Sequence, residues 1–493
     1  MEPQMCYDDV AWEQSDDVSD NWVLQFLDVN VKRPIAEFIL EHDSGDDPEF
    51  AILKKGFYNI TLQMRYTDSA TNIRFSQPGA TLFPEEKMRN EVAVMRYLAD
   101  WTSVPLPFVV HSGPREKSPL KLSPFIMMSH VEHTTTMYDA LNTPGCPYEE
   151  RGVLNPDIDE DRLELLYTQL AEILLQLYKT ELPRIGSLSQ VDDFSWEVNR
   201  RPLSMNMNEL VRLGTLPRSR LPSPDATFKT ASSYIEALAQ LNIQHLFHQR
   251  NDAVQSADDC RRKYVARQLF HKLARNKRLL QPLHENGPFK LWCDDLRPAN
   301  ALLNEDMHLA GVVDWEFTYA APVDFSHAPP WWLLIEKPKY WSGGLEDWTR
   351  VFDRRLKTFL AAMRSCEGAV DKNRLSDHMQ RSWESGDFWV VYAVLNSFAF
   401  DAIYWQKIDQ RFFGPTKTDD SGEAWKERLA QLDEAQRDEM ERLVTRKLEE
   451  MEHRVLAWEP DEYTEEFRQK LKRTREEKEM EVKMASLEVD GRL

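Results

Sequence analysis

Apolar and polar side chains alternate along residues 57–66 of the chain. One side of the alternation carries Tyr58, Ile60, Leu62 and Met64, and the other carries Asn59, Thr61, Gln63 and Arg65. Because successive side chains of a strand point to opposite faces, this period of two predicts a β-strand. A turn at residues 68–70 follows, and residues 72–75 predict a strand that returns beside the first.

A helix is predicted for residues 84–101. Pro84 fits the first helical turn, and the acidic residues that follow it there suit the positive end of the helix dipole. The apolar stripe of this helix consists of Met88, Val92, Met95 and Leu98. Glu91 lies beside the stripe. Two short apolar runs, 106–110 and 125–128, predict further strands, so that residues 50–130 combine strands with one helix.

After residue 130 the pattern is mainly helical. A strong amphipathic helix is predicted from the spacing of Leu163, Leu166, Leu170, Ile173, Leu174 and Leu177. Residues 234–246 and 264–280 are two further candidate helices. Residues 388–404 are nearly all apolar, which predicts a single buried helix.

The two ends of the chain differ from its middle. The first twenty residues are acidic and are predicted to be mobile, and residues 22–40 predict two short helices, the second beginning at Pro34. From about Asp419 onward the chain is dense in Glu, Lys and Arg, which predicts a solvated helix on the flank of the domain. The alternative, a partner-binding coiled coil, is disfavoured because the apolar spacing is too irregular for heptads.

Length and charge limit the classes of protein that fit. A chain of 493 residues corresponds to about two to four structural units. The net charge of −21 works against binding to nucleic acid or to anionic membranes, and it is weakly compatible with a cationic substrate. No apolar run is long enough to span a membrane, and no basic secretory or mitochondrial signal is found, so a cytoplasmic location is expected.

The five cysteines are spaced too widely for a CxxC pair. Their number is odd, which predicts reduced thiols in a reducing compartment and no structural zinc site.

Candidate chemistry lies in the stretch LWCDDLRPAN, residues 291–300. Residues 289–292 predict a strand, and Pro298 prevents a helix from beginning after it. Two further strands are predicted at 301–303 and 309–313, with a turn between them. The chain therefore forms a loop that leads into a β-hairpin, with polar side chains at the open end.

Three of these polar side chains, Asp295, Asn300 and Asp314, are expected to converge there. Carboxylate and amide oxygens suit Mg²⁺, which needs only one or two carboxylates in addition to phosphate oxygens. Phosphoryl transfer requires a base near the acceptor hydroxyl and a metal between the phosphates. An Asp and an Asn five residues apart are weak evidence alone, but the strand, loop, hairpin and second Asp together are more specific. The alternative is that the three side chains only cap turns.

Two segments carry a resemblance to a known family. FPEEKMRNEVAVMRYLADWTSVPLPFV and CDDLRPANALL…GVVDWEFTYAAP resemble the aminoglycoside phosphotransferase (phosphotransferase enzyme) family, and especially its large fungal group, which is mostly uncharacterised. The resemblance covers about residues 50–330 and extends more loosely to the tail. It implies a two-lobed, protein-kinase-like α+β fold, with a small β-rich N-lobe and a larger, mostly helical C-lobe.

The resemblance also implies site residues. Asp295 matches the catalytic-loop base, and Arg297 lies where protein kinases often keep a lysine that contacts the moving phosphate, although a plain surface arginine is an equal alternative. Asn300 and Asp314 match the metal ligands. Glu91 matches the helix glutamate that pairs with the phosphate-contacting base of the returning strand.

The resemblance also assigns residues that contact the nucleotide and a residue that supports the catalytic loop. Residues 125–131 match the strand and hinge that pack against adenine, with Met128, Ser129 and Val131 as the nucleotide contacts. Gly56 matches the phosphate loop, and Asp324 matches a buried acid that braces the catalytic loop.

Three positions depart from the family pattern. Cys293 replaces a histidine that serves as a scaffold; a catalytic thiolate is the sharper alternative, but no histidine lies near on the same element. Arg74 replaces the strand lysine. It keeps the charge and can form two bonds, while a solvent-facing arginine is the alternative. Gly56 is the only glycine of the phosphate loop, which is weak evidence for nucleotide binding.

The predicted organisation has four parts. Residues 1–49 form an acidic segment with short helices, and residues 50–131 form the N-lobe. Residues 132–415 form the helical C-lobe, with an insertion near 183–285, and residues 416–493 form a charged helical tail. Trp331 and Trp332 are interpreted as core or as a wall of the substrate cleft rather than as a cofactor site.

The expected activity is ATP- and Mg²⁺-dependent transfer of a phosphoryl group to a hydroxyl of a small molecule, with no nucleic-acid or membrane partner. The alternative is a pseudokinase that binds nucleotide or a partner without turnover. Cys293, Arg74 and the single Gly56 favour the pseudokinase, and the intact set of metal ligands favours the enzyme. Protein-kinase activity is disfavoured, because the few residues between Asp314 and Asp324 leave no room for a long activation loop. The acceptor and the oligomeric state are not predicted.

Overall fold

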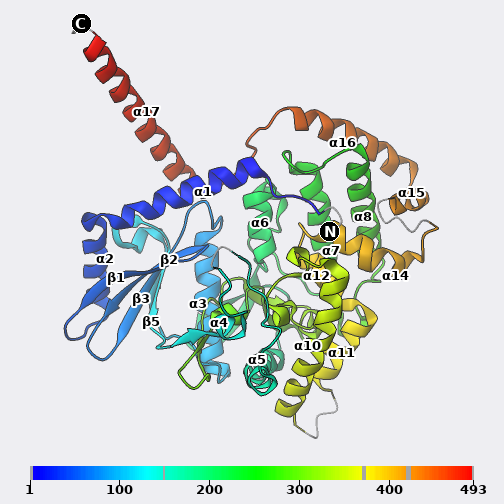
Figure 1. The fold of residues 1–493 in the computed structure, drawn as a ribbon, viewed down its shortest axis with the longest axis horizontal. Helices are drawn as coiled ribbons and strands as arrows, with labels where there is room; N and C mark the ends of the chain where they lie inside the picture. Colours follow the sequence, from blue (N-terminus) through cyan, green and yellow to red (C-terminus); the bar gives the residue numbers. More distant parts are fainter. Residues whose placement is uncertain (1–3, 148–149, 369–372, 418–422, 491–493) are drawn as a thin grey trace.

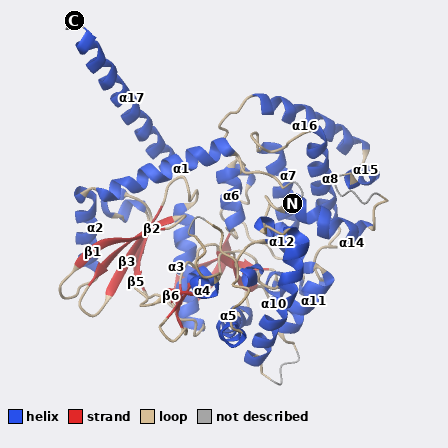
Figure 2. Ribbon diagram, viewed as in Figure 1, coloured by secondary structure: helices blue, strands red, loops and turns tan. Residues whose placement is uncertain are grey.

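The computed structural model describes residues 4–147, 150–368, 373–417 and 423–490. A five-stranded antiparallel sheet occupies one end of the molecule, and a larger body of helices occupies the other (Figure 1). Figure 2 shows the strands of this sheet gathered in one lobe, with helices dominating the remainder. The predicted α+β class, with a sheet-rich N-terminal lobe and a mostly helical lobe after it, is confirmed.

The N-lobe sheet has the strand order β1-β2-β3-β5-β4. Its strands are β1 (Glu49–Lys55), β2 (Asn59–Arg65), β3 (Ala70–Ser76), β4 (Val109–Gly113) and β5 (Phe125–Ser129). Helix α3 (Pro84–Trp101) connects β3 to β4, as its apolar stripe predicts. The strand predicted for 106–110 begins later, at Val109. The sequence pattern missed β1, because this edge strand buries no side chain fully.

The two faces of the sheet are covered by different elements. Ile60, Leu62 and Met64, which the alternation places on one face, are buried against Trp22 and Ile35 of the N-terminal helices. Side chains on the opposite face, such as Ile126 and Met128, belong to the core that includes α3. The N-terminal helices are therefore part of the N-lobe core.

The N-terminal segment differs from its prediction. The first twenty residues were expected to be mobile, but α1 (Asp9–Leu24) begins there, with the carboxylate of Asp8 accepting the backbone N–H of Ala11 at 2.9 Å. Its buried side chains are Ala11, Ser15, Val18, Ser19 and Trp22. Their spacing places them on one helix face, while the acidic residues of the helix lie mainly on the other. The many acids of this stretch hid the short buried stripe.

Helix α2 (Val29–His42) follows a short 3-10 turn, and its start is also corrected. Pro34 was expected to begin this helix but lies inside it. The helix begins five residues earlier, because the Asp28 carboxylate caps it by accepting the N–H of Asn30 at 2.9 Å. An internal proline removes one backbone hydrogen bond and crowds the carbonyl of the preceding turn, and the burial of Ile35 and Ile39 opposes this cost.

The first part of the C-lobe contains five helices and one hairpin among the residues described. The elements are β6 (Thr135–Thr136), α4 (Met137–Leu141), α5 (Glu160–Lys179), β7 (Ser187–Asp192), β8 (Ser195–Arg200), α6 (Met205–Leu213), α7 (Ala231–His248) and α8 (Ala257–Arg275). The predicted helices at 163–177, 234–246 and 264–280 correspond to α5, α7 and α8. Ser256 caps α8, so that this helix begins earlier than its apolar pattern indicated.

The second part of the C-lobe holds the short strands of the candidate site and a further set of helices. The elements are β9 (Lys290–Cys293), β10 (Ala301–Leu303), β11 (Leu309–Val312), β12 (Thr318–Ala321), α9 (Val323–His327), α10 (Gly344–Cys366), α11 (Leu375–Ser385), α12 (Asp387–Leu395), α13 (Phe400–Ile403), α14 (Asp409–Phe413), α15 (Ala424–Arg428), α16 (Glu434–Glu452) and α17 (Glu462–Asp490). β10 pairs with β11 and β6, and β9 pairs with β12.

The single helix expected for residues 388–404 is wrong. It is broken between α12 and α13, where Ser397 exchanges two hydrogen bonds with Asn206. The backbone N–H of Ser397 donates to Oδ1 of Asn206 at 3.1 Å, and Nδ2 of Asn206 donates to its hydroxyl at 2.9 Å. A buried amide thus replaces helical hydrogen bonds, which apolar periodicity cannot reveal.

The last helix, α17, extends away from the body of the molecule (Figure 1). Its first turns are anchored: Tyr463 and Phe467 pack on the N-lobe core, and the indole of Trp22 donates a hydrogen bond to the Tyr463 hydroxyl. Residues 473–480 are exposed, in agreement with the predicted solvated helix. No described helix combines the length and the apolar character that crossing a membrane would require.

Trp22 should be critical to the N-lobe. It is fully buried, so Trp22→Ala should lower the free energy of unfolding by about 3–5 kcal/mol, as is usual for removing a buried aromatic ring. Trp101→Ala is the matched control, since Trp101 is 66% exposed and its loss should cost only about 0.5 kcal/mol. Denaturant unfolding monitored by circular dichroism measures both, and equal losses would contradict the position of α1 in the core.

Candidate functional site

The β10–β11 hairpin brings the predicted trio together. Ala301 pairs with Val312, and the N–H of Val313 donates to the carbonyl of Asn300 at 2.9 Å, so that Asn300 and Asp314 lie at the same open end. The amide nitrogen of Asn300 donates to the Asp295 carbonyl at 2.8 Å and to its carboxylate at 3.3 Å. Asp314 has a positive φ of 60°, a conformation that aspartate tolerates better than most residues. The structure therefore joins all three residues in one place.

Asp295 is a buried carboxyl with a shifted acidity. Burial raises its pKa to about 6, Arg297 opposes the shift, and the nearby charges of Glu316 and Asp314 add to it. Arg297 approaches closely, with Nε at 3.0 Å from Oδ1. A carboxyl with this pKa is mostly ionised at neutral pH, yet it is far more basic than an exposed aspartate. These are the properties of a general base.

Arg74 lies on β3 at the centre of a buried ionic network. Its guanidinium forms ion pairs with Glu91 of α3 and with Asp314, and both Arg74 and Glu91 are buried. Burial raises the pKa of Glu91, and the positive charge of Arg74 counteracts this effect. The predicted pairing of Arg74 with Glu91 is present. The contact with Asp314 makes this arginine a bridge between the N-lobe and the hairpin.

A second buried ion pair lies beside the first, and sequence reasoning missed it. Lys87, one helical turn before Glu91, forms an ion pair with Glu316, and its ammonium also donates to Oδ1 of Asn59 at 2.9 Å. The Asn59 amide donates to Glu316 at 3.0 Å. Although burial alone would raise it, the charges of Lys87 and Arg74 hold the pKa of Glu316 below its ordinary value. Two features of the sequence could have indicated this pair. Lys87 lies four residues before Glu91 on the same helix face, and Glu316 follows Asp314 by two residues.

The donor set fits a magnesium ion that is also held by phosphate. The Asn300 nitrogen is directed at Asp295, which leaves its oxygen as the candidate ligand, and the Asp314 side chain is 38% exposed. Within the described part of the chain, no cluster of three His, Cys, Asp or Glu side chains could hold a metal alone. One carboxylate and one amide oxygen are compatible with Mg²⁺, which takes its remaining ligands from phosphates and water.

Gly56 lies in the turn between β1 and β2. Its N–H donates to the carbonyl of Asn59 at 2.8 Å, and its carbonyl accepts the Gln77 amide at 2.8 Å. The tip of this hairpin reaches the C-lobe, where the Tyr58 hydroxyl donates to Glu209 at 3.0 Å. The loop is therefore held across both lobes.

The three residues predicted to contact the nucleotide base lie at the end of β5 and just after it. Met128 and Ser129 end β5, and the N–H of Ser129 donates to the Phe108 carbonyl at 2.9 Å. Val131 packs against Gly311 of β11 so closely that a Cβ at this glycine would lie 2.8 Å from a Val131 methyl. The hinge thus contacts the hairpin that carries Asp314.

Cys293 is the last residue of β9, opposite Thr318 of β12. Its thiol is buried, contacts the Glu316 carbonyl at 3.7 Å, and has a pKa raised by burial. A raised pKa suppresses the thiolate, so the environment supports a scaffold role and offers no activation for a nucleophile.

The adjacent Asp294, which sequence reasoning did not single out, is a structural anchor. Its carboxylate accepts hydrogen bonds from the Met205 N–H at 2.8 Å, the Trp292 indole at 2.7 Å and the Tyr319 hydroxyl at 3.2 Å. Burial raises its pKa to about 6. Asp324, expected to brace the catalytic loop, instead accepts the Gln281 N–H at 3.3 Å. Asp294 is therefore the acid that ties this loop to α6.

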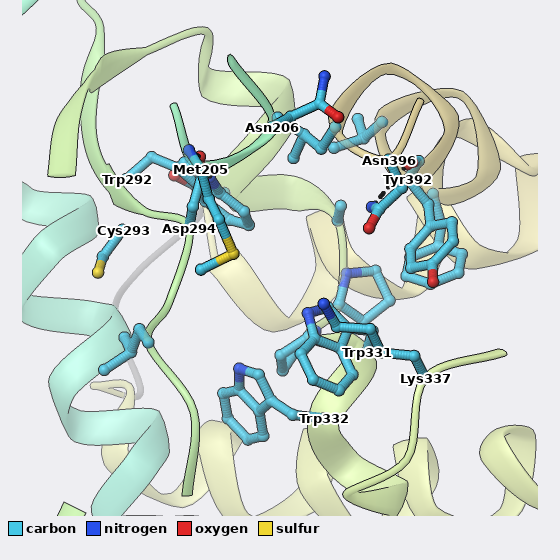
Figure 3. A pocket seen from close by; sticks show the side chains of 18 of the residues that line it. Met205, Asn206, Trp292, Cys293, Asp294, Trp331, Trp332, Lys337, Tyr392 and Asn396 are labelled. Carbon is cyan, nitrogen blue, oxygen red and sulfur yellow. Dashed lines mark hydrogen bonds between the residues drawn. The ribbon is translucent and has the colours of Figure 1, made fainter. Parts of the chain in front are cut away.

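A cavity of about 240 Å³ lies in the C-lobe beside the loop. Figure 3 shows Met205, Trp292 and Asp294 on one side of it and Trp331, Trp332 and Lys337 on the other. Leu296, the residue after Asp295, is also part of the lining, and Lys337 is close enough for its charge to influence the pKa of Asp295. The two tryptophans form cleft wall, as interpreted from the sequence.

Comparisons with known proteins identify only distant structural likenesses. No family model and no curated protein sequence matches the chain. An aminoglycoside phosphotransferase in complex with AMP-PNP and hygromycin B is similar, at 13% identity and a TM-score of 0.39, over 77% of this chain and 99% of that one. An ethanolamine kinase from Plasmodium vivax is similar, at 12% identity and a TM-score of 0.39, over 82% and 88%.

A type I macrolide 2'-phosphotransferase is likewise similar, at 11% identity and a TM-score of 0.40, over 78% of this chain and 96% of its own. At these scores the likenesses carry no argument about what this chain binds or does.

Removing Lys87 should be strongly destabilising. Lys87→Met leaves Glu316 buried without its cation, and breaking one side of a buried ion pair costs about 3–5 kcal/mol. Lys55→Met is the control, because the Lys55–Asp20 pair is exposed and such pairs are worth about 0–1 kcal/mol. Urea unfolding measures both variants. If they lose equal stability, the buried network does not hold the lobes together.

The thiol of Cys293 should be unreactive in the folded protein. Burial and the raised pKa both suppress its thiolate, whereas Cys6 is exposed and serves as the internal reference. Iodoacetamide labelling at pH 8, followed by peptide mass spectrometry, should show Cys6 modified at least about tenfold faster, and denaturation should remove the difference. Equal native rates would restore the thiolate hypothesis.

Proposed function

We propose that this chain transfers the γ-phosphoryl group of ATP to a hydroxyl of a small molecule. The observation that carries the proposal is the convergence of three features: a buried carboxyl with a raised pKa at Asp295, two oxygen donors at Asn300 and Asp314, and a cavity beside them. The coarse similarity to small-molecule kinases is consistent with this activity but does not carry it. Membership in the fungal group of the family stays a prediction.

In this mechanism, Asp295 accepts the proton of the acceptor hydroxyl. The hydroxyl oxygen then forms its bond to the γ-phosphorus while the bond from that phosphorus to the bridging oxygen breaks, and the nucleoside diphosphate leaves. The Asn300 amide holds the Asp295 carboxylate in place at 3.3 Å, and Arg297 at 3.0 Å keeps it ionised. Arg297 would also contact the moving phosphate.

Asn300 and Asp314 would hold a magnesium ion, which when bound neutralises charge on the phosphates. Arg74 would contact a phosphate in addition to Glu91, since a guanidinium can serve two anions at once. Met128, Ser129 and Val131 would contact the base of the nucleotide, and Gly56 would lie over its phosphates.

A second candidate, a pseudokinase, is favoured by one specific observation. Arg74 already binds Asp314, so that one of the two proposed metal ligands is occupied by a cation within the protein. If this bridge persists when nucleotide is present, metal binding is weakened and turnover is lost. Loss of turnover with retained nucleotide binding distinguishes this candidate from the enzyme.

The central prediction concerns Asp295. Asp295→Asn removes the base and leaves the other site residues, so ATP–Mg²⁺ affinity should change by no more than a few fold while turnover falls by about 10²–10⁴. In the wild type, kcat/KM should rise with pH through about 6, since the base acts only when deprotonated and its pKa is raised to about 6.

Calorimetric titration of ATP–Mg²⁺ beside an ADP-release assay over a panel of hydroxyl compounds makes both measurements. Asp306→Asn is a matched control, because Asp306 lies exposed in the β10–β11 turn, outside the site. Nucleotide binding without transfer to any acceptor, including water, would replace the enzyme with the pseudokinase. Absence of nucleotide binding would overturn both.

A further inference from the structure

The cavity beside the loop is mostly apolar and aromatic. Its lining includes Tyr58, Trp292, Trp331, Trp332, Phe388 and Tyr392. At about 240 Å³ it is smaller than the roughly 300–1,000 Å³ of drug-sized sites, which favours a compact ring compound. Polar groups are few in such sites, and they decide the orientation and the specificity of the ligand.

Two lysines supply the distinctive polar groups of this cavity. Lys337 lies over the Trp331 ring, at 4.9 Å from its centroid, and Lys339 donates to the Tyr7 hydroxyl at 2.9 Å. In the described part of the chain, neither ammonium has a carboxylate within salt-bridge distance. Burial lowers the pKa of both lysines, that of Lys339 to about 7. The charge of Arg297 lowers the pKa of Lys337 further, and the charge of Lys337 lowers the pKa of Lys339 further. Two half-buried cations without a counter-ion form a site for an anion.

Among the described residues, the acids near the cavity form no ion pair with these lysines, although the charges of Asp295, Glu209 and Glu336 partly oppose the lowering of the lysines' pKa values. Glu209 accepts the Tyr58 hydroxyl at 3.0 Å and lies 3.7 Å from Arg212, while Asp294 accepts hydrogen bonds from three other donors. Glu336 accepts the backbone N–H of Lys337 at 2.8 Å and lies 3.8 Å from Arg151. The charge presented to a ligand is therefore positive, although the whole chain carries −21.

We infer that the cavity binds a compact, ring-containing alcohol that carries one anionic group, held by Lys337 and Lys339. The ring packs against Trp331 and Trp332, and the hydroxyl points toward Asp295, next to Leu296 of the lining. The assignment of this cavity as the acceptor site rests on the proposed function. The binding of an anion by Lys337 and Lys339 does not depend on that function. A multiply cationic aminosugar is excluded as the ligand, because the two lysines would repel it and the cavity is too small.

Binding of four naphthalene probes tests the anion site without nucleotide. 2-Naphthoate and 2-naphthyl phosphate carry the two kinds of anion, 2-naphthamide is neutral, and 2-naphthylmethylammonium is cationic. Titration calorimetry should give at least one anion a Kd about tenfold or more below that of the amide, as expected for a charge-assisted hydrogen bond, and the cation should bind weakest. Tighter binding of 2-naphthoate would indicate a carboxylate site, and tighter binding of 2-naphthyl phosphate would indicate a phosphate site.

Variants assign the preference to the lysines. Lys337→Met with Lys339→Met should abolish the difference between anion and amide, and the corresponding double arginine variant should retain it. Lys407→Met is the control, because Lys407 lies over the Trp389 ring at 5.2 Å, outside the cavity lining. Circular dichroism confirms that each variant is folded. Equal binding of anion and amide by the wild type, or loss of the preference in the control alone, overturns the inference.

A further arm separates the inference from the proposed function. 6-(Hydroxymethyl)-2-naphthoate with ATP–Mg²⁺ should yield a phosphate ester in the wild type and at least about a hundredfold less in Asp295→Asn. If the anion preference holds but no ester forms, the anion site stands and the acceptor role of the cavity fails. If a cationic aminosugar is phosphorylated instead, the phosphotransferase stands and the assigned substrate class is wrong.

Discussion

The buried charges at the junction of sheet, helix and hairpin are the constraint on which the rest of the structure depends. Arg74 and Lys87 are cations, and Glu91, Glu316 and Asp314 are their anions. Removing charges from water costs several kcal/mol for each ion, and only close partners recover that cost. Losing Arg74 would leave Glu91 without its ion-pair partner, and losing either Lys87 or Glu316 would leave the other without its partner.

This network fixes the position of the site as well as the packing of the lobes. Glu316 follows Asp314 by two residues, so the ion pair of Glu316 with Lys87 holds the end of the hairpin against α3. Asp294 holds the other end of the loop to α6 by accepting the Met205 N–H. Asp295 lies between two anchored segments, which fixes the position of its carboxyl, as the proposed role of a base would require.

Local sequence patterns were sufficient for β2, β3, β5, α3 and the trio at the hairpin, because spacing along a strand or a loop determines which side chains meet. They were insufficient for partners from distant parts of the chain. The spacing of Lys87 and Glu91 does not identify Glu316 as the partner of Lys87, and the tryptophans before Lys337 do not show that its ammonium faces the cavity. The burial of α1 was missed because five acidic residues are interspersed among its apolar ones. The break after α12 was missed because an amide on α6 causes it. The domain boundaries and the roles of the site residues stay predictions.

Helix α1 spans both lobes. Ser15 donates to the Gly79 carbonyl at 3.0 Å on the N-lobe side and accepts the Arg212 guanidinium at 2.6 Å on the C-lobe side, and the N–H of Asp8 donates to the Leu213 carbonyl at 2.8 Å. The entropy of orienting the lobes is therefore lost during folding and not when a ligand arrives. A ligand that enters such a preformed site needs little rearrangement, so its heat-capacity change reports the surface it covers and not the closure of two domains.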